Sequence, residues 1–141
     1  MRALNNTIFF SATYEPAKNA VYKSDGTEAG TTVFYDMSNG DYSSFLYPYV
    51  YNDELYFYGN SANGGLIKTD GTTITTLADT NTGAAGDFVN GFIEYNGLLY
   101  FSADVGSFGT QELFKTDGSM VLNLQLKDNP PTSPILTCIS Q

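Results

Sequence analysis

Short runs of apolar and aromatic residues, separated by turn-forming residues, recur along most of the chain. A clear example is residues 54–59, Glu-Leu-Tyr-Phe-Tyr-Gly, which follow an Asn52-Asp53 pair. Runs of this length that are rich in aromatic and β-branched residues and bounded by Asn, Asp and Gly are typical of β-strands. No segment has apolar residues at a sustained helical spacing, so the pattern predicts essentially no helix.

The middle of the chain predicts four strands in succession. Asn52-Asp53 forms a tight turn between the first two strands, and a Gly-containing loop at residues 60–65 precedes the third. Asp70-Gly71 is a second hairpin signal, because Asp and Gly both tolerate positive φ. The four strands are expected at residues 45–51, 54–59, 66–69 and 73–77.

This four-strand pattern occurs three times. Each copy has an Asn-containing turn followed by an apolar strand, and further along a Lys-Ser/Thr-Asp-Gly motif, whose aspartates Asp25, Asp70 and Asp117 are 45 and 47 residues apart. Four-stranded units of this length are typical of β-propeller blades. We therefore predict a single all-β repeat domain over residues 1–141, with about twelve strands in three four-stranded antiparallel units. Blade units are expected at residues 5–43, 44–86 and 87–126, with residues 127–141 supplying a terminal strand that completes a blade.

A pair of adjacent aromatic residues recurs on the second strand of each unit. The pairs are Phe9-Phe10, Tyr56-Phe57 and Tyr100-Phe101. Neighbouring residues on a strand point to opposite faces, and both faces of a propeller blade contact another blade. We expect the aromatic pairs to be buried between units, and stacking against a ligand is the alternative.

Composition and charge narrow the class of protein. The chain has 11 Tyr, 10 Phe and 14 Gly, which suits an all-β protein. Its 15 acidic and 6 basic residues give a net charge of −9, which disfavours binding to nucleic acid and to anionic membranes. No apolar run approaches the roughly 20 residues of a membrane span. Residues 1–10 do not resemble a signal peptide.

Cysteine and histidine usage removes several kinds of site. Cys138 is the only cysteine, and the chain has no histidine. An internal disulfide, the usual zinc sites and a Ser–His or Cys–His catalytic pair are therefore excluded. Cys138 lies in an apolar run and is expected to be a small buried residue.

The repeated motifs resemble a known family. Residues 112–119 read Glu-Leu-Phe-Lys-Thr-Asp-Gly-Ser, residues 24–31 read Ser-Asp-Gly-Thr-Glu-Ala-Gly-Thr, and residues 96–103 read Asn-Gly-Leu-Leu-Tyr-Phe-Ser-Ala. These segments resemble the ELWxxDGT (TDGT) repeat of bacterial, often large and secreted proteins, with Tyr22, Ile67 and Phe114 in place of the family's Trp. The resemblance covers nearly the whole chain. It implies a propeller-like protein that is extracellular or on the cell surface, and it implies no reaction.

Two patterns of acidic residues are candidate sites. Asp25, Asp70 and Asp117 could form a ring of carboxylates, but an aspartate in an Asp-Gly turn more often accepts hydrogen bonds from its own backbone. Oxygen-bearing side chains after the fourth strands resemble part of a calcium loop, which needs six to eight oxygen ligands. Neither stretch has a closing Glu, so we expect turn chemistry, no metal and no cofactor. The weak calcium candidates are Asp36, Asp41, Asp79 and Asp87.

Two classes of function stay open. The first is a non-catalytic binding or scaffolding module with a glycan or protein ligand. Tyr42, Tyr47, Tyr49 and Tyr51 form a Tyr-rich stretch, in which alternation would put the last three on one face, as core or as contact residues. The alternative is a glycan hydrolase or lyase that uses an Asp/Glu pair on a propeller face. Hydrolysis needs two carboxyl groups roughly 5 to 10 Å apart, and the sequence singles out no such pair.

The ends of the pattern suggest a mode of assembly. The chain is expected to begin at the second strand of a unit, residues 7–13, and to end at a first strand, residues 135–140. Three blades are too few for a closed propeller, which typically has four to eight. We therefore expect a head-to-tail homodimer that closes a six-bladed ring by exchange of these strands. The alternative is a fragment of a larger propeller.

Overall fold

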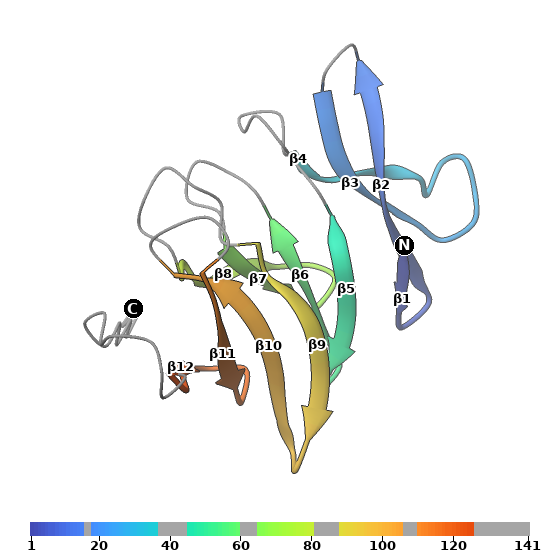
Figure 1. The fold of residues 1–141 in the computed structure, drawn as a ribbon. Coiled ribbons are helices and arrows are strands. Elements are labelled where there is room, and N and C mark those ends of the chain that lie inside the picture. Colours follow the sequence, from blue (N-terminus) through green and yellow to red (C-terminus); the bar gives the residue numbers. More distant parts are fainter. Residues whose placement is uncertain (16–17, 37–44, 60–64, 81–87, 106–109, 126–141) are drawn as a thin grey trace.

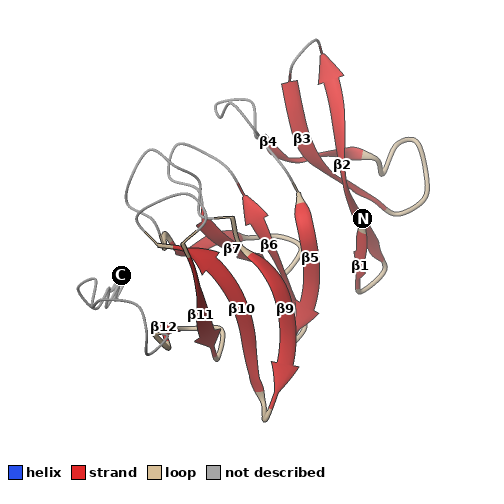
Figure 2. Cartoon of the chain, viewed as in Figure 1, coloured by secondary structure: helices blue, strands red, loops and turns tan. Residues whose placement is uncertain are grey.

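The computed structural model describes residues 1–15, 18–36, 45–59, 65–80, 88–105 and 110–125. Within these residues the chain forms twelve strands and no helix (Figures 1 and 2). The strands make three four-stranded antiparallel sheets, each in the order of the chain, and none of the sheets closes on itself. The predictions of an all-β fold and of four antiparallel strands per unit are confirmed. The terminal strand expected at residues 135–140 lies outside the described residues, as does Cys138.

The three sheets are called units 1, 2 and 3. Unit 1 consists of β1 (Arg2–Leu4), β2 (Thr7–Glu15), β3 (Lys18–Ser24) and β4 (Thr32–Asp36). Unit 2 consists of β5 (Leu46–Tyr51), β6 (Glu54–Gly59), β7 (Gly65–Thr69) and β8 (Ile74–Ala78). Unit 3 consists of β9 (Asn90–Tyr95), β10 (Leu98–Asp104), β11 (Gln111–Thr116) and β12 (Val121–Asn123). The strands of unit 2 agree within one residue with the bounds expected from the sequence.

Unit 1 has a first strand, β1, that the sequence analysis missed. β1 pairs with β2 across the Asn5-Asn6 turn, with Arg2 opposite Phe9 and Leu4 opposite Thr7. The expectation that the chain begins at a second strand is therefore wrong, and with it the reason for closing a ring by strand exchange. Three residues are too few to reveal alternation, but the Asn5-Asn6 turn itself required a strand on both sides.

Two-residue turns join the first and second strands of each unit. In units 2 and 3 both turn residues have positive φ: 48° at Asn52, 58° at Asp53, 50° at Asn96 and 74° at Gly97. Positive φ at both positions is the signature of the type I′ turn, whose twist matches that of antiparallel strands. The Asn-rich turn signal in the sequence therefore located these hairpins.

The sheets pack face to face, and the first strands of neighbouring units contact each other. β1 contacts β5, and β5 contacts β9 beside it (Figure 1). Two hydrophobic clusters fill the spaces between the sheets. Leu4 and Phe9 of unit 1 pack with Leu55 and Phe57 of unit 2 in one of them. Tyr56 and Leu66 of unit 2 pack with Leu99 and Phe101 of unit 3 in the other, along with further residues of both units.

Each unit therefore has two distinct faces. We call the face that carries Phe9, Tyr56 or Tyr100 the forward face, because in units 1 and 2 it packs against the next unit. We call the opposite face, which carries Phe10, Phe57 or Phe101, the backward face.

The aromatic pairs are fully buried only where a neighbouring unit covers them. Tyr56 and Phe57, in the middle unit, are both inaccessible to solvent. In the outer units only the inward member of each pair is buried, Phe9 in unit 1 and Phe101 in unit 3. Phe10 and Tyr100 are partly exposed. The predicted burial between units is confirmed for four residues and is wrong for these two, because each lies on an outer face.

A bulge in β5 separates Tyr47 from the two tyrosines that were expected to share its face. The pairing with β6 shifts between Leu46 and Tyr49, and Tyr47 has a φ of 53°. Tyr47 is exposed, Tyr51 is buried, and Tyr49 stacks on Phe92 of unit 3. Pro48 lacks an N–H donor for the ladder, which favours a bulge at this point. The expected shared face is therefore confirmed for Tyr49 and Tyr51, which pair with Tyr56 and Glu54, and is wrong for Tyr47. Tyr42 lies outside the described residues.

Candidate functional site

The Asp-Gly turns connect the third and fourth strands of each unit. Only their glycines have positive φ, with values of 92° at Gly26, 96° at Gly71 and 97° at Gly118. In unit 2 the connection is four residues long, because Thr69 pairs with Ile74. The hairpin expected at Asp70-Gly71 is confirmed, but its connection is longer than a two-residue turn and only the glycine uses positive φ. The aspartate keeps negative φ, and its side chain closes the turn.

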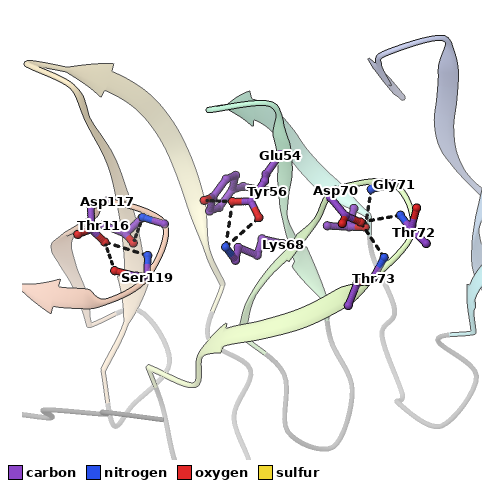
Figure 3. A network of polar contacts seen from close by, with 12 residues as sticks. Glu54, Tyr56, Lys68, Asp70, Gly71, Thr72, Thr73, Thr116, Asp117 and Ser119 are labelled. Atoms are coloured by element: carbon purple, nitrogen blue, oxygen red, sulfur yellow. Dashed lines mark hydrogen bonds and ion pairs between the residues drawn. The ribbon is translucent and has the colours of Figure 1, made fainter. Parts of the chain in front are cut away.

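The carboxylate of each turn aspartate accepts hydrogen bonds from the amides that follow it. Asp70 Oδ1 accepts from the N–H of Thr72 at 2.8 Å and of Thr73 at 2.7 Å (Figure 3). Asp117 Oδ1 accepts from the N–H of Ser119 at 2.8 Å, and Asp25 Oδ1 from the N–H of Thr27 at 2.9 Å. The prediction that these three aspartates cap their own turns is confirmed.

A hydroxyl group before each Asp-Gly pair is a second cap that the sequence analysis missed. The side chains of Ser24, Thr69 and Thr116 are buried. Their oxygens accept hydrogen bonds from the N–H groups of Gly26, Gly71 and Gly118 at 3.0, 2.9 and 2.9 Å. A Ser or Thr stands directly before the Asp in all three repeats, and this was the available signal.

These hydrogen bonds favour the ionised form of the turn carboxyl groups. The N–H of Ser119, then its hydroxyl and the N–H of Met120, lower the pKa of Asp117 to about 2. The N–H groups of Thr73 and Thr72 lower the pKa of Asp70, and the hydroxyl and then the N–H of Thr27 lower the pKa of Asp25. Carboxyl groups held as anions are poor general acids near neutral pH.

We predict that acid destabilises the fold through these three turns. Their pKa values in the folded chain lie below the ordinary aspartate value of about 3.9, so protons bind preferentially to the unfolded chain. The stability that the carboxylates contribute is complete above about pH 4 and is lost as the pH falls towards 2. The triple variant D25N/D70N/D117N keeps an oxygen acceptor in each turn without this titration.

The measurement is the melting temperature of both proteins from pH 7 to pH 2. The triple variant should lose less of its melting temperature between pH 4 and pH 2 than the natural chain does. The control for folding is a single cooperative transition of the triple variant at pH 7, at a lower melting temperature than that of the natural chain because the charged acceptors are gone. The same acid-induced loss in both would contradict the prediction.

A polar network lies on the forward face of unit 2, beneath the turn of unit 3 (Figure 3). Lys68 Nζ lies 2.9 Å from both carboxylate oxygens of Glu54, and Tyr56 Oη donates to Glu54 Oε2 at 3.0 Å. Burial, and then the hydrogen bond to Glu54, raises the pKa of Tyr56 well above its usual range, so the hydroxyl stays protonated. Gly118 of unit 3 packs so closely that a Cβ atom there would lie 2.8 Å from Tyr56 Oη. The network therefore forms part of the surface of unit 2 on which unit 3 packs.

A further hydrogen bond crosses the same junction. Tyr51 Oη, at the end of β5, donates to the carbonyl oxygen of Gly97 at 2.7 Å. Gly97 belongs to the turn between β9 and β10, so the bond ties the first strand of unit 2 to the first hairpin of unit 3. The junction thus has a hydrogen bond near the inner strands and close packing at the Asp-Gly turn.

The structure describes two of the four calcium candidates, and both lie at the ends of fourth strands. Asp36 ends β4 in unit 1 and Asp79 follows β8 in unit 2, while Asp41 and Asp87 lie outside the described residues. Among the residues that the structure describes, no group of three or more acidic, His or Cys side chains is placed to hold a metal ion.

We predict that calcium has little effect on stability, because neither candidate stretch has the closing bidentate Glu of a calcium loop. The melting temperature should agree within error in a chelator and in excess calcium chloride. A marked rise with calcium would instead identify Asp36, Asp41, Asp79 and Asp87 as ligands, because a bound ion stabilises the folded state by mass action.

Two buried acids in unit 3 were not found from the sequence. Asp104 and Glu112 are almost inaccessible, and Glu112 accepts a hydrogen bond from the amide of Asn123. Glu112 pairs with Ala103, so register puts Glu112 and Asp104 on opposite faces of the sheet. They are therefore not a facing pair of the kind that glycan hydrolysis requires. Alternation with the buried residues Phe114 and Thr116 was the signal that Glu112 points inward.

No protein-family model, curated protein or solved structure matches this chain. In the part of the chain that the structure describes, no helix has the length and apolar character needed to cross a membrane.

Proposed function

We propose that the chain is a non-catalytic module of β-propeller type that binds or scaffolds other molecules outside the cytoplasm. The observation that carries this proposal is where the recurring polar residues are used. The Asp and Ser/Thr of every Lys-Ser/Thr-Asp-Gly motif cap their own turn. These polar residues, which recur in all three units, are thus used to hold the turns of the units themselves.

The two junctions support the propeller arrangement. Gly71 of unit 2 lies against Phe9 and Leu4 of unit 1, and Gly118 of unit 3 lies against Tyr56 of unit 2. The same turn therefore meets the same face each time, and the first strands stay together at one edge. A directional junction repeated about a shared inner edge is how propeller blades are arranged.

The family resemblance supports the location. Proteins with the ELWxxDGT repeat are often secreted, and resemblance to them does not imply a reaction. A glycan or another protein is the expected ligand, recognised by the loops and outer surfaces of the units.

A binding screen and a turnover assay on one preparation test this proposal. The chain is applied to a glycan array and then incubated with the same glycans, whose cleavage is followed by mass spectrometry. Binding without cleavage supports the proposal. Cleavage that is abolished by a single Asp→Asn or Glu→Gln substitution, while the melting temperature is kept, would overturn it. If the chain neither binds nor cleaves a glycan, scaffolding is the function that remains, and measurements of assembly test it.

A further inference from the structure

The forward face of unit 3 is exposed and apolar. Register places its residues on one side of the sheet: Tyr100 pairs with Ile93 and with Lys115, Leu98 pairs with Tyr95, and Ser102 pairs with Leu113. Ile93, Tyr95 and Leu113 are exposed, as is Leu122 opposite Lys115. Tyr95 packs edge-on against Tyr100. An apolar patch of this kind on a folded domain marks an interaction site.

The same positions are covered in unit 2. Tyr51, which corresponds to Tyr95, is 2% exposed, whereas Tyr95 is 63% exposed. Leu66, which corresponds to Leu113, is 0% exposed, against 39% for Leu113. Unit 3 packs on the forward face of unit 2 and accounts for the lower exposure of Tyr51 and Leu66. The forward face of unit 3 is therefore one half of a junction that the chain forms twice.

The backward face of unit 1 is the other half of that junction. Ile8 is exposed, and Phe10 is partly exposed and stacks on Tyr22. Their counterparts Leu55 and Phe57 are completely buried against unit 1. The Asp-Gly turn follows the same rule, because Gly71 and Gly118 each meet a preceding unit, whereas Gly26 has open space around it.

We propose that the forward face of unit 3 binds the backward face of unit 1 of a second copy of the chain. The occupant is inferred from continuity: the two exposed faces are the halves of a junction already present between units 1 and 2 and between units 2 and 3. By analogy, Tyr95 donates to the Asn5-Asn6 turn of the second copy, as Tyr51 donates to the carbonyl of Gly97. The Gly26 turn of the second copy then lies over Tyr100.

Two such junctions join two chains into a ring of six units, a size within the usual range for propellers. The interface is heterologous, since different faces meet, and it closes if the rotation between units allows it. This inference rests on the proposed propeller arrangement but not on the absence of catalysis. Assembly and turnover are measured separately, so either proposal can fail alone.

Light scattering on the full chain tests the assembly. At micromolar concentration the natural chain should have the mass of two chains. Tyr95→Lys and Ile8→Lys each place a charge in the junction and should give single chains, whereas Tyr47→Lys should leave the dimer intact. Tyr47 is a matched control, because it is 59% exposed and lies on the middle unit.

Mixing the variants tests which faces meet. Tyr95→Lys has an intact backward face and Ile8→Lys an intact forward face, so an equimolar mixture should recover pairs through one junction. Three outcomes would overturn the proposal: a natural chain that stays monomeric at all concentrations, a dimer that survives Tyr95→Lys, or a mixture of the two variants that stays monomeric. A single natural chain would mean that its own residues 126–141, or a further unit, occupy the face.

Discussion

Replacing Phe101 with alanine should lower the free energy of unfolding by about 3 to 5 kcal/mol, as for other truncations of core phenylalanine. Phe101 is completely buried between units 2 and 3, where it stacks on Phe114 with ring centres 5.4 Å apart. Phe57→Ala should have a similar effect, because Phe57 occupies the same position between units 1 and 2 and lies 5.0 Å from the ring of Phe45. Chemical denaturation, read by far-ultraviolet circular dichroism, measures the loss.

Phe10→Ala is the matched control, because Phe10 occupies the same position in unit 1 and is partly exposed. Its loss should be well below that of Phe101→Ala when the samples are dilute enough to hold single chains. Equal losses at the two positions would show that the backward face of unit 1 is covered within one chain. A loss below about 1 kcal/mol for Phe101→Ala would mean that the register of unit 3 is wrong.

Gly118→Ala should lower the free energy of unfolding by about 2 to 5 kcal/mol. One part of the loss is the strain of an L-residue at positive φ, about 1 to 2 kcal/mol. The other part is overpacking, about 1 to 3 kcal/mol, because the new Cβ atom would lie 2.8 Å from Tyr56 Oη. Gly71→Ala has the same φ strain, but its Cβ atom would meet Phe9 at an ordinary 3.7 Å. Gly71→Ala should therefore lower the free energy of unfolding by the φ strain alone, about 1 to 2 kcal/mol.

A double-mutant cycle with Tyr56→Phe separates the two parts. Phe9 already stands where Tyr56 stands in the next unit, so Tyr56→Phe turns the second junction into a copy of the first. In that background the loss caused by Gly118→Ala should fall towards the loss caused by Gly71→Ala. If the loss is unchanged, the Tyr56 hydroxyl is not what Gly118 must clear.

The sequence located the strands of unit 2 well because three aligned copies reinforce signals that are weak singly. The Asn52-Asp53 hairpin and the capping role of Asp25, Asp70 and Asp117 depend on neighbouring residues only, so local rules were sufficient for them. β1 was missed because three residues show no alternation. The bulge at Tyr47 was also missed. Because one extra residue reverses the side on which the residues beyond it lie, Tyr47 does not share the face of Tyr49 and Tyr51.

Features that depend on contact between units could not be read from local sequence. Phe10 and Phe57 have similar neighbours in the chain, yet one is partly exposed and the other completely buried. Glu112 lies on the backward face of unit 3, the face that packs on unit 2, and it is almost inaccessible to solvent. Corresponding positions hold the small residues Ala20 and Gly65, so the repeat itself gave no indication of a buried acid.

Strand order within the sheets has a consequence for how the chain reaches its fold. Every paired strand in the described sheets is adjacent to its partner in the chain, so each pairing closes only a short loop of polypeptide. Low contact order of this kind favours rapid folding for a β protein, and it allows folding to begin in any unit and spread to the next. Unit 2 is covered on both faces and the outer units on one. Amide hydrogens should therefore exchange most slowly in β6 and β7, with the end units opening first.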